Sequence, residues 1–126
     1  MKNLVASFML FIALVITMVF SMRYLENKCG YYTDKIDALE TIIVNESWEE
    51  AYNSSIGFLE EWKKDSSIVP TFINHIHVET ITNSVLKLTQ YTKYKDKVDS
   101  LATIHEIKFL LEEMMEIEKV TLPNVF

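Results

Sequence analysis

The sequence predicts an all-α protein, in which an N-terminal transmembrane helix is followed by a small antiparallel helical bundle. Three observations lead to this prediction. The stretch from Leu4 to Met22 is rich in apolar residues and holds no charge. Beyond it, apolar residues recur at spacings of three and four, the period of a helix that buries one face. No alternating run and no Asn-Gly or Asp-Gly dipeptide indicates strands joined by tight hairpins.

The apolar stretch is long enough to cross a bilayer once. As a helix it would be about 28 Å long, close to the roughly 30 Å of the hydrocarbon core. Lys2 and Arg23 flank it on its two sides. A cleaved signal peptide is the alternative, because residues 19–21 resemble a small-residue cleavage site. The run is longer than the usual apolar region of a signal peptide, so we expect it to be retained.

This assignment divides the chain into two parts. We expect a membrane anchor over residues 1–23 and an acidic helical bundle over residues 24–126. Lys2 on one side opposes Arg23 and Lys28 on the other, so the positive-inside rule barely decides the orientation. We expect a single-pass protein of the cell membrane, with the bundle outside the cytoplasm.

Composition excludes several classes of protein. The chain has 12 basic and 18 acidic residues and a net charge of −6, which disfavours nucleic acid as a partner. A single cysteine, Cys29, excludes a disulfide within one chain. The two glycines, Gly30 and Gly57, form no Gly-rich phosphate-binding loop. No cofactor is therefore expected.

An apolar seam predicts the first helix. Its residues have a period of 3.5 and are Leu25, Cys29, Tyr32, Ile36, Leu39 and Ile43. The same frame runs without a break through the membrane stretch, at Phe8, Phe11, Val15, Met18 and Met22. We therefore expect one continuous rod from about Asn3 to Val44. The alternative is a hinge at Gly30, where the missing side chain lowers the cost of a bend.

A second helix is expected from about Trp48 to Lys64. Ser47 and Glu50 have the form of a capping box at its start, and residues 65–67 should end it. Its predicted stripe is Trp48, Tyr52, Ser55, Leu59 and Trp62. We expect the two tryptophans to pack in the core rather than to line a partner groove.

Two further helices complete the expected bundle. Pro70 suits an early position of the third, which should end near Thr92. Asp96 is placed to cap the fourth, and Pro123 should stop it. The apolar stripes are Val78, Ile81, Val85 and Leu88 in the third helix, and Leu101, Ile104, Ile107, Leu111, Met114 and Ile117 in the fourth.

One local cluster has the character of metal ligands. His75 and Glu79 are neighbours one helical turn apart, and His77 lies between them in sequence. His105 is the candidate third ligand, but it lies on the side of its helix opposite Ile107. We therefore expect no metal site, with His77 packed at the edge of the core through one bonded ring nitrogen and His75 and Glu79 forming a boundary pair.

The last predicted helix is acidic. Its carboxylates are Glu106, Glu112, Glu113, Glu116 and Glu118. Paired carboxylates serve as general acid and base when their environments differ, and nothing in the pattern sets these apart. Glu112 and Glu116 share a face with His105 and Phe109, which favours a solvated face carrying one exposed aromatic residue. No catalytic residue is assigned.

Three segments carry a resemblance to a known family. They are Asn74–Ile81, Leu88–Tyr91 and the stretch from His105 to Phe126 with its ending Thr-Leu-Pro-Asn-Val-Phe. In these segments the chain resembles domain of unknown function 4363, an uncharacterised family found mainly in clostridia and other Firmicutes. The resemblance covers nearly the whole chain. It implies a small membrane-anchored helical protein with the bundle outside the cytoplasm, and it supplies no catalytic residue.

Two functions from different classes agree with these features. The first is a non-enzymatic accessory or scaffold subunit, anchored in the bilayer through Leu4 to Met22, whose bundle binds a membrane or envelope protein. The second is an extracytoplasmic sensor of a ligand or cation, bound through His75, Glu79 and acidic residues of a neighbouring helix. An enzyme ranks third, because a bundle of this size offers little room for a cleft with convergent groups.

Overall fold

The computed structural model describes the backbone of residues 1–67 and 75–125 and the side chains of residues 1–67 and 76–116. Within these residues the chain forms four helices and no strand. They are α1 (Lys2–Val44), α2 (Trp48–Ser66), α3 (His75–Lys93) and α4 (Lys97–Val125). The predicted all-α fold is confirmed.

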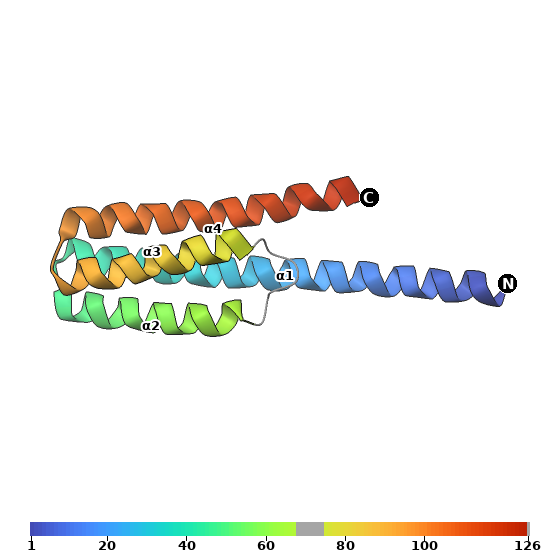
Figure 1. Cartoon of the computed structure of the whole chain (residues 1–126), viewed down its shortest axis with the longest axis horizontal. Coiled ribbons are helices and arrows are strands. Elements are labelled where there is room, and N and C mark those ends of the chain that lie inside the picture. The colour runs from blue at the N-terminus through green and yellow to red at the C-terminus, as the bar shows by residue number, and fades with distance from the viewer. Residues whose placement is uncertain (68–74, 126) are drawn as a thin grey trace.

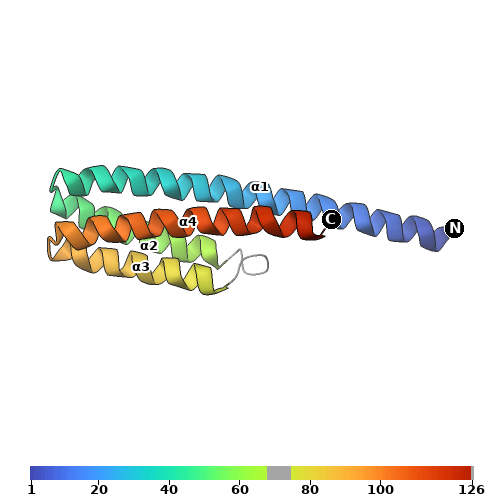
Figure 2. The same cartoon turned by 90° about the horizontal axis from the view of Figure 1, so that it is seen from above.

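The helices lie side by side in an antiparallel bundle, and α1 projects far beyond the others (Figures 1 and 2). Each helix packs on two neighbours, so that α1 contacts α2 and α4 while α3 contacts the same two helices from the opposite corner. The contact between α1 and α2 is the sparsest of the four. Short turns join α1 to α2 and α3 to α4 at the end of the bundle far from the projecting helix (Figure 1).

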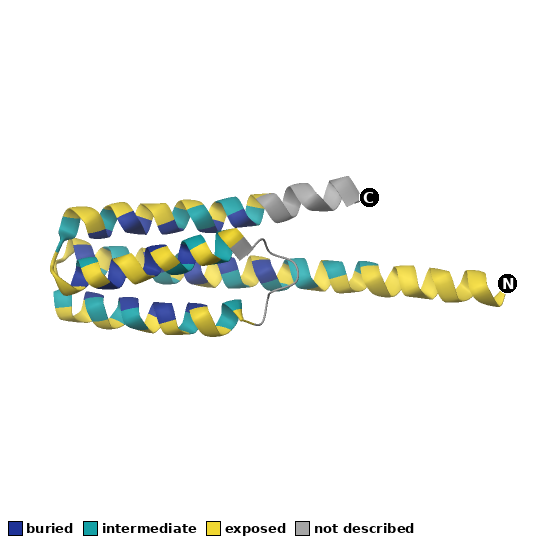
Figure 3. Ribbon diagram, viewed as in Figure 1, coloured by how far each residue is buried: buried dark blue, intermediate teal, exposed yellow. Residues whose placement is uncertain are grey.

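α1 is one uninterrupted helix with two different halves. All six residues of the predicted seam, from Leu25 to Ile43, are buried. In the first half, none of the residues of an apolar stretch long enough to cross a bilayer is buried (Figure 3). Gly30 lies inside the helix and has no positive φ, so the continuous rod is confirmed and the hinge at Gly30 is not formed. One helix of the described residues is therefore long and apolar enough to cross a membrane.

The other three helices close the core around the seam of α1. In α3 and α4 the predicted stripes are largely right, since Ile81, Val85, Leu88, Ile104, Ile107, Leu111 and Met114 are buried. Val78 and Leu101 are partly buried, and the side chain of Ile117 lies outside the described residues. In α2 the buried face is turned toward α3, with which α2 makes its broader contact. Ala51 and Phe58 are buried, Phe58 against the Tyr32 ring of α1, whereas Trp48 and Tyr52 are only partly buried.

The two short turns have the same geometry. Glu46 and Lys95 adopt left-handed φ values of 59° and 60°. In the first turn the Ser47 N–H donates to the Ile42 carbonyl and the Glu46 N–H to that of Ile43, the bonds of a Schellman motif. In the second turn, Lys95 and Asp96 donate to Thr92 and Tyr91 in the same way.

The geometry of these turns shows which of the two predicted helix caps forms. The capping box at Ser47 is wrong, because its side chain makes no cap hydrogen bond. The backbone of Ser47 closes the preceding turn, with ψ of 73° instead of the extended conformation that directs a capping hydroxyl inward. The cap at Asp96 is confirmed, since the Asp99 N–H donates to its Oδ1 at 3.0 Å.

Two predicted helix ends need correction. α2 continues through Asp65 to Ser66, two residues beyond the predicted end at Lys64. α4 continues past Pro123 to Val125, so the predicted stop at Pro123 is wrong. Proline removes one backbone donor, but its fixed φ is compatible with a helix, and near a helix end few bonds depend on that donor. Pro70 lies outside the described residues.

Candidate functional site

The histidines expected near a metal site do not converge in the described part of the chain. His77 is partly buried, with Nε2 4.0 Å from Glu113 Oε1, and its buried Nδ1 has no hydrogen-bond partner. Glu79 and His105 are exposed on different helices. His75 begins α3, but its side chain lies outside the described residues. Among the side chains that the structure describes, no group of three or more potential ligands could hold a metal ion.

The described part of the acidic face of α4 lies as expected, and the side chain of Glu118 lies outside the described residues. Glu112, Glu116 and His105 are exposed, and Phe109 keeps 64% of its surface accessible beside them. Glu113 differs from these residues because it is partly buried and faces His77. The face is therefore solvated and carries one exposed aromatic residue.

Trp62 packs in the core as predicted. It is buried, its Nε1–H donates to Thr82 Oγ1 at 2.9 Å, and its ring meets that of Tyr32 edge to face at 5.1 Å between centroids. Trp48 is only partly buried and packs against the rim of the same core. Tyr31, Phe58 and Trp62 thus surround the Tyr32 ring with edge-to-face contacts.

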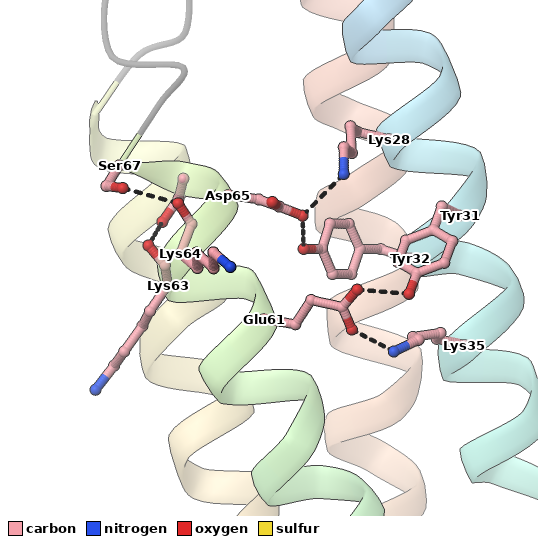
Figure 4. Close-up of polar contacts among 10 residues, drawn as sticks. Lys28, Tyr31, Tyr32, Lys35, Glu61, Lys63, Lys64, Asp65 and Ser67 are labelled. Atoms are coloured by element: carbon pink, nitrogen blue, oxygen red, sulfur yellow. Dashed lines mark hydrogen bonds and ion pairs between the residues drawn. The ribbon is translucent and has the colours of Figure 1, made fainter.

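A polar cluster joins α1 to α2 beside this aromatic group (Figure 4). Lys28 Nζ lies 3.2 Å from Asp65 Oδ2, and the Tyr32 hydroxyl donates to the same carboxylate oxygen. One turn along α2, the two oxygens of Glu61 accept hydrogen bonds from the Tyr31 hydroxyl and from Lys35 Nζ. Two carboxylates of α2 are therefore held by two lysines and two tyrosines of α1.

Electrostatics keeps both carboxylates of the cluster ionised. Partial burial tends to raise the pKa of Asp65, but hydrogen bonds from Tyr32 and Lys28 outweigh it and the pKa lies below its ordinary value. The ion pair with Lys35, aided by Tyr31, lowers the pKa of Glu61. Burial and the neighbouring Asp65 raise the pKa of Tyr32. The cluster therefore holds no carboxylic acid that could donate a proton near neutral pH.

The sequence analysis missed this cluster because its partners are 26 to 37 residues apart. A usable signal was present all the same. Lys28 and Lys35 lie two turns apart on one face of α1, and Glu61 and Asp65 lie one turn apart on α2. In antiparallel neighbours joined by a short turn, such opposite charges can meet at equal heights.

A shallow groove continues the same contact toward the turn. It has a volume of about 380 Å³ and is closed at one end by the Lys35–Glu61 pair. Its lining, apart from that pair, is Ala38, Leu39, Ile42, Ser54, Gly57 and Phe58. A Cβ added at Gly57 would meet no heavy atom within 4 Å. The groove is open because small residues of both helices line it.

The cluster and the groove lie next to each other on the α1–α2 face. Its charged groups are already paired within the chain, and its apolar part is hollow and accessible.

Comparison with known proteins assigns the chain to a family. No curated protein and no solved structure matches it. The model of the family described as "Domain of unknown function (DUF4363)" matches residues 19–125. That range begins in the apolar half of α1 and includes the helices of the bundle. The chain therefore belongs to the DUF4363 family.

Proposed function

We propose that this protein is a non-enzymatic, single-pass membrane protein whose bundle acts as a scaffold or accessory subunit for a membrane or envelope partner. The observation that supports this function is the continuity of α1. Its first half is apolar and uncovered, and its second half supplies the seam at the centre of the bundle. A helix apolar on all sides is suited to lipid, and a striped one to a protein core.

The rod gives the bundle a fixed position. From Met22 to Val44 it rises about 33 Å from the end of the span. A flexible linker would let the bundle turn freely, whereas an unbroken helix ties its orientation to that of the span. A scaffold that presents one face at a defined height gains from this rigidity.

The chemistry of the described side chains supports a role without catalysis. The carboxylates of the polar cluster are ionised and paired, and the exposed ones on α4 lie on an open face. The small pocket beside Tyr32 and Met114 is almost wholly apolar. None of these groups forms a convergent set around a space that a substrate could fill.

The anchor is tested by intact-mass measurement and alkaline carbonate extraction of the full chain. A mass that begins at or near Met1, with the protein in the membrane pellet, is the expected result. A mature N-terminus at Met22 would show that the segment is a cleaved signal peptide. Orientation is measured with a Leu86→Cys variant, because Leu86 is 49% exposed while the natural Cys29 is buried. Labelling of intact cells by a membrane-impermeant maleimide is expected for a bundle outside the cytoplasm.

The partner is tested by photocrosslinking in native membranes at natural expression. A photoreactive residue at Phe109, on the exposed face of α4, is compared with one at Leu86 on α3. The expected result is a discrete adduct with one other protein from one of the two positions. If both positions gave adducts only with lipid or with other copies of this chain, the proposed scaffold function would be overturned.

A melting scan separates the scaffold from a sensor. A cation or small anion at 100 times its dissociation constant stabilises a protein by about 2.7 kcal/mol. The scaffold predicts no such shift with zinc, calcium or phosphate. A shift with one of them, abolished in the His75→Ala, Glu79→Ala variant, would favour the sensor.

A further inference from the structure

The charged groups that pair across α1 and α2 lie in two columns. Lys28 and Lys35 form a basic column on α1, and Glu61 and Asp65 form an acidic column on α2. The ion pairs between them place Lys28 level with Asp65 and Lys35 level with Glu61 (Figure 4). The charged side chains keep 17% to 39% of their surface accessible, so they remain within reach of a second molecule.

From this arrangement we infer that the α1–α2 face pairs with the same face of a second copy of this chain, about a two-fold axis parallel to α1. The inference rests on the proposed anchor, because two copies anchored in one bilayer point the same way. A two-fold axis in that direction sets α1 of each copy opposite α2 of the other and keeps every residue at its height.

Charge complementarity selects this axis. With it, Lys28 and Lys35 of one copy face Asp65 and Glu61 of the second copy, so each in-chain pair joins a four-charge cluster of alternating sign. A two-fold axis across the helices would instead set α1 against α1 and lysine against lysine. Such like-charge contact is unfavourable.

The groove supplies the apolar part of the contact. It lies directly beyond the Lys35–Glu61 pair, and Ala38 and Gly57 in it are exposed. Small residues let two helix pairs approach closely, and the partly buried Ile42 projects beside the hollow. Two such faces bury each other's apolar lining while their charged columns remain paired.

The α1–α2 face is too small to form a stable dimer between free molecules, so pairing depends on anchoring in a membrane. α2 is about 28 Å long, and two adjacent helices are about 20 Å wide, which gives on the order of 560 Å² for each copy. A standard interface buries about 800 Å² for each partner. The contact is therefore weak between free molecules, and confinement of both copies to one bilayer raises their effective concentration.

Crosslinking through an introduced cysteine, with the full chain in liposomes, tests the pairing. Gly57→Cys places a thiol in the groove, Leu86→Cys places one on the exposed face of α3, and the wild-type chain with its buried Cys29 is the background. A short bismaleimide is expected to give dimers from Gly57→Cys at least about tenfold more than from the other two. Equal yields from all three chains would overturn the inference.

A charge-reversal experiment tests the axis itself. Lys35→Glu leaves only acidic groups at this level of the face, and Glu61→Lys leaves only basic ones, so each variant repels itself and both lose the in-chain pair. In the Gly57→Cys background, each variant alone should crosslink about tenfold less than the parent, and an equal mixture of the two should restore the yield. Circular dichroism checks that both fold.

Failure of restoration by the two folded variants would overturn the two-fold pairing. A chain that remains in the membrane pellet but gives no dimer would overturn only this inference. A chain that is absent from the membrane pellet would overturn the proposed anchor. The failure of one proposal is thus distinguishable from the failure of the other.

Discussion

Apolar residues recur with the same period in both halves of α1, but other helices cover only the second half. Residues of the second half such as Ile36 are fully buried, whereas Phe8 and Phe11 in the same frame are 64% and 54% exposed. The opposite face explains the difference. In the second half it carries charges such as Asp34 and Asp37, and in the first half it is apolar as well. The apolar period alone shows which face of the helix is apolar. Whether the opposite face is charged or apolar indicates whether that part of the helix is suited to water or to lipid.

The largest loss of stability is expected from a substitution in the buried half of α1. Ile36→Ala removes a fully buried side chain and should lower the free energy of unfolding by about 3 kcal/mol, through lost burial and the cavity left behind. Ile12→Ala in the uncovered half should change it by less than about 0.5 kcal/mol. Urea unfolding in detergent, followed by circular dichroism, measures both. An equal loss from Ile12→Ala would mean that the first half also packs against the bundle.

A smaller effect concerns the polar cluster, which lies only in the second half. Tyr32→Phe removes a hydroxyl that donates to Asp65 from a buried ring and should cost about 1 to 2 kcal/mol. Tyr31→Phe is the matched control, since Tyr31 is 41% exposed and its bond to Glu61 is accessible to water. A larger loss from Tyr31→Phe in urea unfolding would contradict the assigned importance of burial.

The same cluster predicts a pH dependence. The folded-state pKa of Asp65 is lowered, so its stabilisation is present above the ordinary pKa of about 4 and is lost as the pH falls through the folded value. Stability should therefore decline in acid below about pH 4. Asp65→Asn should make that decline shallower, with Glu61 contributing the remainder. An unchanged slope in thermal melts at a series of acidic pH values would rule out this role for Asp65.

Another prediction compares two buried hydroxyl groups, that of Ser100 on α4 and that of Ser55 on α2. Ser100 Oγ is buried without a hydrogen-bond partner, so Ser100→Ala should raise the free energy of unfolding by about 1 kcal/mol. Ser55→Ala is the control, because the Ser55 hydroxyl bonds the Tyr52 carbonyl and approaches Thr92 Oγ1 at 3.3 Å. That variant should be destabilised. The reverse ranking in urea unfolding would contradict the assignment.

The smallest expected effect tests whether the helix is continuous where the two halves of α1 meet. Gly30 is helical and nothing lies within 4 Å of an added Cβ, so Gly30→Ala should raise stability by about 0.5 to 1 kcal/mol through helix propensity. Differential scanning calorimetry can detect the gain. A loss would show that the rod bends at this position in solution.

The fold was predictable because its signals are local. The seam of α1 and the cap at Asp96 depend on residues within a few turns of each other. The polar cluster was not predictable in this way, because Asp65 contacts Tyr32 only when α1 and α2 pack together. Local rules also failed at Ser47, where closure of the preceding turn uses the backbone that a cap requires.

A load along the membrane normal would enter the bundle through α1 and act parallel to its contacts with α2 and α4. Force in that direction shears the six buried side chains of α1, spread over about 27 Å, together rather than in succession. A load on a flexible tether at a corner of the bundle would peel the same contacts apart one turn at a time. By continuing its apolar half into a helix that packs on both α2 and α4, the chain would distribute a pull from a membrane over those contacts.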